Sequence, residues 1–559
     1  MKSVFNPAQR EVALTSLAET QFDLLVVGGG VSGCGTALDA ASRGLKVAMI
    51  EVNDFASGTS SRSSKLIHGG LRYLEQYDFK LVREALKERE LMVSRIAPHL
   101  VSPVSFLYPL HEPLKERGYV GAGLMLYDAL RGREHVLPSH RHVSVKRMRQ
   151  IAPGLRPDVL RGGVLYYDAQ VDDARHTMTL ARTASLYGAT IATRVECIDL
   201  LREGDAVVGA QVRDVESGQI FEIRSTVTAL AAGVWSDGLH ERAGVSPGYS
   251  VTMSKGVHIT VPGSAIALET GVILKTDVSV LFIIPWKNEW IIGTTDTPWT
   301  GDRENPLATQ EDISYLLDQA NLVLLRQLRE SDILGIFVGL RPLVATNQGS
   351  PTTKISREHI VDHPLTGLVS VAGGKYTTYR IMARDLVDAA VGDLDRKVPE
   401  SCTEEIGLIG ADGVVALRNR VELLAQEHGV TQALITHLLN RYGSRFEEVL
   451  DLAGDDQVML SPITDGLEYL RVEILYAVLF EGARSIEDVL ARRTRICFEI
   501  ADGGLEIARD VAGLIAGVLG WSDEQIDCEV SLYSKLISSQ SVLALRPLDS
   551  SSDGLRSVS

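Results

Sequence analysis

The feature that most constrains this fold is a glycine-rich turn set between two short apolar segments. Residues 22–27 read FDLLVV, residues 28–33 read GGGVSG, and residues 46–51 read KVAMIE. Short apolar runs of this kind predict strands buried on both faces of a sheet. The small-residue segment between them predicts a helix. Strand, glycine turn, helix and strand within about thirty residues form a βαβ unit, which predicts an α/β fold built on a parallel sheet.

Gly28, Gly30 and Gly33 have the GxGxxG spacing of a dinucleotide site. In such a site the first glycine permits the turn, the second lets the backbone approach a pyrophosphate, and the third packs the helix on the strand. Glu51 ends the second strand, where a carboxylate accepts hydrogen bonds from a ribose hydroxyl and repels a 2′-phosphate. The pattern therefore predicts FAD or NAD rather than NADP. The alternative is a glycine turn that holds no ligand.

Hydroxyl groups crowd the segment that follows the second strand, at Ser60, Ser61, Ser63 and Ser64. They could donate hydrogen bonds to the phosphates and the ribityl chain of a long cofactor, which favours FAD over NAD. A solvated serine loop would explain the same residues.

Composition excludes several other classes of protein. The chain has 559 residues and a formal net charge of −16, so general nucleic-acid binding is not expected. Its five cysteines show no CxxC spacing, which predicts a reducing compartment with neither a metal site nor a disulfide framework. No run approaches the ~18 apolar residues of a spanning helix, and no leader sequence is recognised at the N-terminus.

The pattern of predicted secondary structure changes along the chain. Residues 1–20 predict a lead-in helix or arm, residues 78–97 a helix, and residues 98–150 an irregular segment with several prolines. From about residue 400, strand signals give way to amphipathic helical runs. We therefore predict a helical C-terminal domain over 401–540 and a disordered polar tail over 541–559.

Several blocks in order along the chain resemble the FAD-dependent (aerobic, respiratory) glycerol-3-phosphate dehydrogenases. The resemblance extends from about residue 22 to residue 535. Beyond the glycine turn, its blocks are TSSRSSKLIHGGLRYLE at 59–75, VDDAR at 171–175, KGVHI at 255–259, IPW…IIGTTD at 284–296, GLRPL at 339–343, GGKYTTYR at 373–380 and SIEDVLARRTR at 485–495. The blocks at 59–75 and 373–380 are far more specific than the glycine turn.

The resemblance implies a fold, an activity and a set of partners. The expected fold is a glutathione-reductase-like (Rossmann-type) FAD-binding domain within residues 1–400, interleaved with an α+β substrate domain (roughly 80–165 and 245–345), and followed by the all-α domain. The expected reaction is oxidation of sn-glycerol 3-phosphate to dihydroxyacetone phosphate, with electrons passed to a membrane quinone. The family also implies a cytoplasmic protein, peripheral on the inner face of the plasma membrane, and a homodimer.

The same resemblance adds residues to the expected cofactor site. Besides the glycines, Glu51 and the serines, these are Lys65, His68, Gly69, Gly70, Val195, Gly233, Trp235, Gly374, Lys375 and Thr377. Thr295, Asp296 and Tyr73 lie in family blocks and are expected in a second layer of residues around the pocket.

The implied substrate has a phosphate dianion and a secondary alcohol, so its site needs cationic donors and a proton acceptor. The expected cationic ligands are Arg341, Lys375, Arg72 and, more weakly, Arg357. His258 is the leading candidate for the base because imidazole titrates near 6.5. His68 and Lys255 are its rivals. The alternatives are solvated cations and a histidine paired within its own strand.

Residues 111–149 carry eight Lys and Arg against four Asp and Glu, next to the apolar run 124–127. They could meet a lipid surface, or they could form a substrate-domain helix with a solvated basic face. Three other functions remain open from the sequence. They are an oxidase of the same substrate that reduces O2 to H2O2, an amine or amino-acid oxidase, and a non-enzymatic flavoprotein scaffold.

Overall fold

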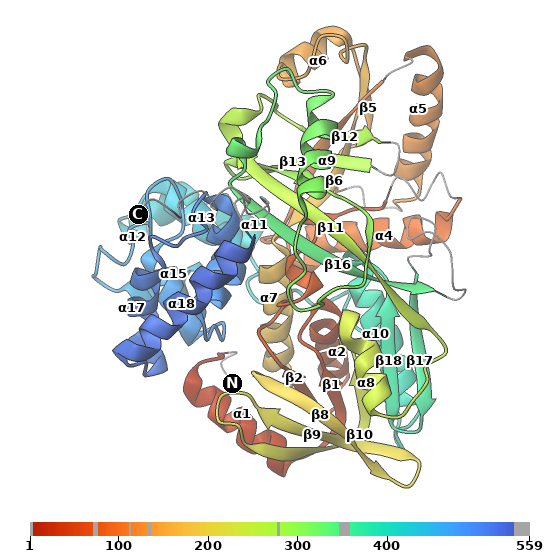
Figure 1. The fold of residues 1–559 in the computed structure, drawn as a ribbon, viewed down its shortest axis with the longest axis vertical. Coiled ribbons are helices and arrows are strands. Elements are labelled where there is room, and N and C mark those ends of the chain that lie inside the picture. The colour runs from red at the N-terminus through yellow and green to blue at the C-terminus, as the bar shows by residue number, and fades with distance from the viewer. Residues whose placement is uncertain are drawn as a thin grey trace, which may run out of the picture.

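The structure is a computed structural model. It describes residues 4–70, 77–110, 113–131, 136–276, 280–345 and 358–540. Two sheets and a group of C-terminal helices make up the molecule (Figure 1). The predicted α/β class is confirmed, with helices taking over at the C-terminal end.

The first sheet has the strand order β17-β18-β10-β1-β2-β7, and a meander of β8 and β9 joins it at β10. Strands β18, β10, β1, β2 and β7 pair in parallel. The strands are β1 (Gln21–Val27), β2 (Val47–Glu51), β7 (Thr190–Thr193), β8 (Val195–Glu203), β9 (Ala206–Asp214), β10 (Ile220–Leu230), β17 (His359–Leu365) and β18 (Leu368–Gly373). The helices packed beside it are α2 (Val31–Ser42), α7 (Asp173–Leu186) and α10 (Tyr379–Val391). Its predicted strands at 22–27 and 46–51 are confirmed.

The second sheet has the order β15-β11-β14-β13-β12-β4-β6-β3, with β16 on β11 and β5 on β6. Its strands are β3 (Leu66–Ile67), β4 (Val101–Pro109), β5 (Arg141–Val143), β6 (Gly163–Val171), β11 (Ser250–Pro262), β12 (Gly271–Lys275), β13 (Val280–Trp286), β14 (Glu289–Gly293), β15 (Thr297–Trp299) and β16 (Gly335–Ala345). Helix α9 (Gln310–Asn321) packs on β11, β13 and β14. The chain crosses between the two sheets several times, as the resemblance implied.

The expectation of an irregular segment over 98–150 is wrong. Strand β4 pairs along its whole length with β6, and it is followed by helix α5 (Pro113–Ala129), β5 and helix α6 (Val145–Ile151). The prolines at the two ends of β4 and the glycines within α5 hid both elements from a local reading of the sequence. The predicted helix at 78–97 is observed as α4 (Phe79–Leu91) and a π-helical turn at Met92–Ile96.

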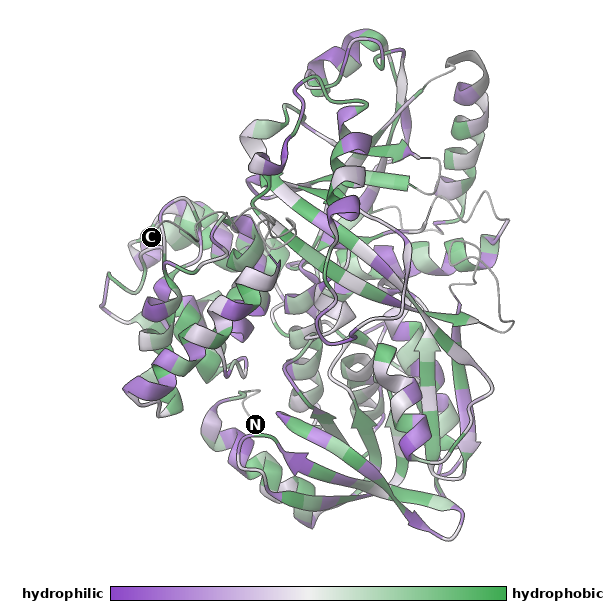
Figure 2. Cartoon of the chain, in the orientation of Figure 1, coloured by the Kyte–Doolittle hydropathy of each residue, from purple (hydrophilic) through white to green (hydrophobic). Residues whose placement is uncertain are grey.

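The C-terminal helices lie to one side of both sheets, on the left in Figure 1. They are α11 (Val414–Arg418), α12 (Val421–His428), α13 (Gln432–Tyr442), α14 (Phe446–Ala453), α15 (Arg471–Leu479), the π-helical segment η9 (Asp488–Thr494), α16 (Ile496–Glu499), α17 (Ala508–Leu519) and α18 (Asp523–Gln540). Figure 2 shows hydrophobic and hydrophilic residues alternating along these helices, as the amphipathic pattern predicted. The tail predicted at 541–559 lies outside the described residues.

No helix within the described ranges combines the length and the apolar character that crossing a membrane requires.

Candidate active site

A cavity of about 540 Å³ lies between the two sheets. The first sheet contributes the glycine turn and Glu51 to its wall. The second contributes His258 on β11 and Arg341 on β16, and the turn after β18 contributes Lys375. Residues predicted separately for a nucleotide, for a phosphate and for proton transfer therefore share one cavity.

The glycine turn has the geometry that a dinucleotide needs. Gly28 has a φ of +120°, and a Cβ built on it would lie 2.6 Å from the carbonyl oxygen of Ala231. A Cβ on Gly33 would lie 1.9 Å from the carbonyl oxygen of Gly28, because helix α2 packs closely on the turn. Gly30 caps α2 without a side chain, so the positive end of the helix faces the cavity open to an anion.

Glu51 is held where a ribose would be recognised. Its carboxylate accepts hydrogen bonds from the backbone N–H of Gly29 at 2.6 Å and of Asn53 at 2.8 Å. Burial raises the pKa of Glu51. A glycine cradle, a helix N-terminus that faces the cavity and a half-buried carboxylate fit the phosphates and the ribose of FAD, and the cavity extends beyond them to the second sheet.

Most of the other residues predicted for the cofactor also line this cavity. They are Ser60, Ser63, Ser64, His68, Val195, Gly233, Trp235, Gly374, Lys375 and Thr377. Ser60 accepts a hydrogen bond from the N–H of Val31 in the first turn of α2, at 2.9 Å.

Five predicted cofactor residues do not line the cavity. Gly33 acts in helix packing, as described above. Ser61 and Lys65 are buried, and the Lys65 amine points to Asp173. Gly69 donates its N–H to the Tyr127 hydroxyl at 2.9 Å, and Gly70 is also buried.

His258 is buried at the cavity wall, opposite Phe337 of β16 in the strand register. Its ring stacks on Phe337 with the centroids 4.7 Å apart and the planes 6° apart. Its Nε2 is 2.8 Å from the hydroxyl oxygen of Ser64, and its Nδ1 has no hydrogen-bond partner among the described residues. Burial, then Arg341 and Lys65, hold the pKa of His258 well below its usual value, so the imidazole is neutral.

Arg341 extends toward β11 and the segment after β14. Its Nη2 donates to the Thr294 hydroxyl at 2.9 Å, and its Nη1 donates to the carbonyl oxygen of Thr295 at 3.2 Å. A Cβ on Gly256 would lie 2.5 Å from Nη2, so the glycine of the KGVHI block makes room for this guanidinium. These contacts fix the orientation of a cation at the cavity wall.

Lys375 follows two glycines with φ values of +74° and +78°, Gly373 and Gly374. It caps the short helix η7 (Tyr376–Thr378), where Thr377 accepts a hydrogen bond from the N–H of His68 at 3.2 Å. This bond joins the turn after β18 to the segment at 66–70, and both contribute to the cavity wall.

Of the three candidates for the base, Lys255 points away from the cavity. Its Nζ is 2.5 Å from the Asp312 carboxylate, and both side chains are buried. His258 and His68 both line the cavity.

The Thr295 hydroxyl accepts a hydrogen bond from the N–H of Val257, and Asp296 accepts one from Ser254. Arg72, Tyr73 and Arg357 lie outside the described residues.

The cavity also has lining residues that sequence reasoning missed, among them Arg62, Arg242, Arg303 and Glu304. Arg303 comes from the segment between β15 and α9, and it donates to the carbonyl oxygen of Val234 at 2.9 Å. Arg62 lies within the block at 59–75, whereas no local pattern marks Arg303 and Glu304, because their segment reaches the cavity only through the packing of the two sheets.

Comparison with known proteins gives a consistent result. Residues 23–380 match the FAD dependent oxidoreductase family, and residues 401–526 match the C-terminal domain of alpha-glycerophosphate oxidase. The chain is 50% identical over 554 residues to the glycerol-3-phosphate dehydrogenase of Mycobacterium leprae, covering 99% of this chain and 94% of that protein. It is 36% identical over 542 residues to the mitochondrial glycerol-3-phosphate dehydrogenase of Mus musculus, covering 92% and 73%. The solved structure of the Bacillus halodurans glycerol-3-phosphate dehydrogenase complexed with FAD superposes with a TM-score of 0.80, at 27% identity, covering 97% of this chain and 99% of that one.

Proposed function

The chain belongs to the FAD-dependent glycerol-3-phosphate dehydrogenase family, and we propose that it oxidises sn-glycerol 3-phosphate to dihydroxyacetone phosphate. The observation that carries this proposal is that His258, Arg341 and Lys375 line the same cavity as the dinucleotide turn. The names of the relatives support the same substrate.

Arg341 and Lys375 bind the anionic end of the substrate. A guanidinium offers parallel N–H donors to phosphate oxygens, and an ammonium adds a compact charge. The hydroxyl and carbonyl contacts of Arg341 orient its donors before substrate arrives, so less side-chain freedom is lost on binding. Arg72 and Arg357 remain further candidates for the same phosphate.

His258 accepts the proton of the C2 hydroxyl. Its neutral imidazole can take up a proton, and its stacking on Phe337 and its bond to Ser64 fix the plane of the ring. His68 remains the second candidate, whereas Lys255 is committed to Asp312 and lies off the cavity wall.

FAD, when bound, accepts the hydride that leaves C2. The residues of this chain orient the substrate for that transfer, remove the hydroxyl proton and keep the negative phosphate paired with cations.

We propose a membrane quinone as the electron acceptor and contact with the lipid surface through α5. Tyr119, Met125 and Leu126 are exposed on this helix, and basic side chains follow it in β5 and α6. Leu124 and Tyr127 of the predicted apolar run are buried instead, so half of that run belongs to the core. A homodimer, implied by the resemblance, stays a prediction.

The test is anaerobic addition of sn-glycerol 3-phosphate to the purified flavoprotein. We expect loss of the flavin absorbance with this substrate and none with glycerol, which lacks the phosphate. Readmitted air should reoxidise the flavin slowly, and a quinone analogue should accelerate that step. Rapid reoxidation with one H2O2 per flavin would instead identify an oxidase, and a flavin that never bleaches would contradict the proposed substrate.

A further inference from the structure

Lys65 is a buried cation that the proposed reaction leaves unexplained. Its side chain is fully buried, and Nζ donates to Oδ1 of Asp173 at 3.0 Å and to the carbonyl oxygen of Ser61 at 3.0 Å. Trp286, Phe337 and Phe498 surround the amine. An ammonium group is costly to bury in such surroundings, where an apolar side chain of similar length would fit.

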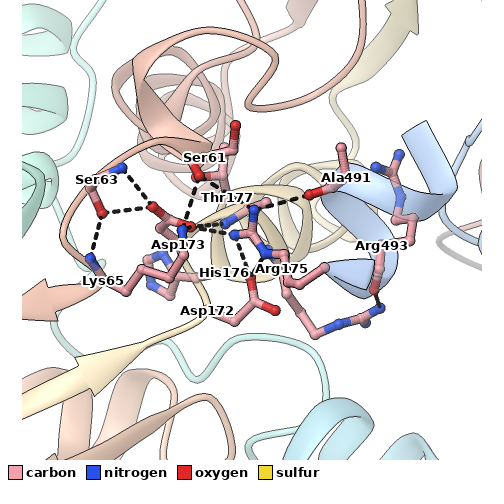
Figure 3. A network of polar contacts seen from close by, with 12 residues as sticks. Ser61, Ser63, Lys65, Asp172, Asp173, Arg175, His176, Thr177, Ala491 and Arg493 are labelled. Carbon is pink, nitrogen blue, oxygen red and sulfur yellow. Dashed lines mark hydrogen bonds and ion pairs between the residues drawn. The ribbon is translucent and has the colours of Figure 1, made fainter. Parts of the chain in front are cut away.

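The C-terminal helices hold this cation in place. Arg495, between η9 and α16, is buried and contacts the Asp173 carboxylate. Its Nη2 also donates to Oδ1 of Asp172 at 2.6 Å, and its Nη1 to the Ser61 carbonyl at 3.3 Å. Figure 3 shows Lys65, Ser63 and Asp173 joined in one polar network. We call residues 59–70 the cavity loop. Asp173 thus lies between Lys65 of the cavity loop and Arg495 of the C-terminal helices.

Phe337 brings Lys65 close to His258. The Lys65 Nζ lies 4.8 Å from the centroid of this ring, and the His258 ring stacks on it at 4.7 Å. The charged groups that face His258 are Lys65 from the loop and Arg341 from β16, while its neighbour on β14 is Gly293. Among the described residues no carboxylate is paired with this imidazole, so its charged form is opposed by two cations.

We propose that Lys65 is a positioning residue for the reaction, because its ammonium, fixed by Asp173 and Arg495, keeps His258 uncharged and ready to accept a proton. The inference rests on the proposed role of His258 as the base. Burial and then Arg495 lower the pKa of Lys65 to about 8, so the amine is protonated at neutral pH and loses its charge in alkaline solution.

Lys65→Met tests this role, and thermal stability is measured beside activity because the substitution removes one cation from a buried ionic network. It leaves Asp173 paired with Arg495 and still bonded to Ser63 and to the N–H of Ala174. The Ser61 carbonyl keeps its bond to Arg495. No buried polar group is left without a partner, and an unbranched apolar side chain suits the aromatic surroundings.

The experiment measures kcat/KM for sn-glycerol 3-phosphate from pH 5.5 to pH 9 in the parent and Lys65→Met holoenzymes. Removing the charge should raise the pKa of His258 by about one unit, the size expected for one charge at this range and an effective dielectric constant of about 20. The ratio of variant to parent should be near one above pH 8.5, where the parent amine is itself neutral. Below that pH the ratio should fall as the pH drops toward the pKa of His258, and the fall is limited to about tenfold for a shift of one unit. Ionisation of the substrate is common to both proteins and cancels in the ratio.

Two further variants separate charge from shape. Lys65→Gln also removes the charge and should give the same pH-dependent ratio. Lys87→Met removes an exposed ammonium that pairs with Glu404 and does not line the cavity, and its ratio should not change with pH. A flat ratio for Lys65→Met, or a drop seen in only one of the two Lys65 variants, overturns the inference. A parent enzyme that does not oxidise sn-glycerol 3-phosphate at all would instead contradict the proposed function.

Discussion

At the scale of single residues, glycines decide where the functional side chains can lie. Gly256 makes room for the guanidinium of Arg341, and a Cβ on Gly293 would lie 2.2 Å from the His258 ring. The motif blocks predicted most of the cofactor residues that line the cavity, because each block is a continuous stretch of sequence. They did not predict that Lys65 turns away, because its partners Asp173 and Arg495 are distant in the sequence.

Arg341→Gln tests the assignment of the phosphate ligand. A hydrogen bond to a charged group contributes about 1.5–3 kcal/mol, so the KM for sn-glycerol 3-phosphate should rise about 10- to 100-fold. Steady-state kinetics measure this change. Arg326→Gln removes an exposed arginine paired with Asp332 and is the matched control, which should leave KM unchanged. An unchanged KM in Arg341→Gln would place the phosphate elsewhere.

Gly33→Ala tests the dinucleotide turn. The added methyl group must displace the Gly28 carbonyl, and overpacking of this kind costs about 1–3 kcal/mol. We therefore expect the Kd for FAD to rise about 10- to 100-fold, measured by the fluorescence of released flavin. Gly517→Ala, also in a helix but with open space at its Cβ position, is the control and should retain FAD. Full retention by Gly33→Ala would argue against a cofactor at this turn.

At the scale of elements, the glycine-turn unit was predictable because β1, α2 and β2 follow one another and carry their own signals. Strand β4 was not, because its partner β6 lies more than fifty residues further along and its prolines resemble loop punctuation. The junction of β6 and α7 connects the two sheets and the C-terminal helices. It leaves the second sheet, enters a helix beside the first, and sets Asp172 and Asp173 against the C-terminal helices.

Arg495→Gln tests whether the C-terminal helices support the cavity loop. Removing one partner of a buried ionic network costs about 3–5 kcal/mol, because the other charges stay buried. Thermal denaturation should show a clear loss of stability, and the protein should release FAD more readily. Arg509→Gln breaks an exposed pair with Asp527 in the same region and should cost less than about 1 kcal/mol. Equal losses of stability in the two variants would mean that the buried network stabilises the protein no more than an exposed ion pair does.

At the scale of the whole molecule, the cavity exists only because the chain crosses between two sheets. Composition and local pattern predicted the βαβ unit and the helical C-terminal region but missed the strands and helices within 98–150, and the resemblance supplied the interleaving of the regions. The segment carrying Arg303 shows the limit of such reasoning, because only the packed molecule brings it to the Val234 carbonyl.

Buried histidines make the stability of the molecule depend on pH. Burial lowers the pKa of His99 to about 3 and of His176 to about 4, and it also lowers those of His240 and His258. Below pH ~6.5 the unfolded chain takes up protons that the folded protein does not, so these histidines lower the free energy of unfolding as pH falls. Above that value they are neutral in both states, and they do not make the free energy of unfolding depend on pH.

His240→Phe isolates this effect, because neither ring nitrogen of His240 has a hydrogen-bond partner in the described part of the chain. The variant should match the parent near pH 7.5 and be more stable than the parent near pH 5, because the parent's folded state resists protonation of His240. Denaturant unfolding at the two pH values measures the difference. His363→Phe, at an exposed residue bonded to Asp393, should show no such gain. A gain equal at both pH values would show that proton uptake is not its cause.

The central claim is that His258 acts as the base in a cavity shared with FAD. The most direct measurement is the rate of anaerobic flavin reduction by sn-glycerol 3-phosphate in the parent and in His258→Asn, followed by stopped-flow absorbance with FAD content and substrate affinity checked separately. The account predicts a loss of about 10²- to 10⁴-fold in the reduction rate, with FAD and substrate still bound. A reduction rate within a few-fold of the parent would contradict it and would pass the role to His68.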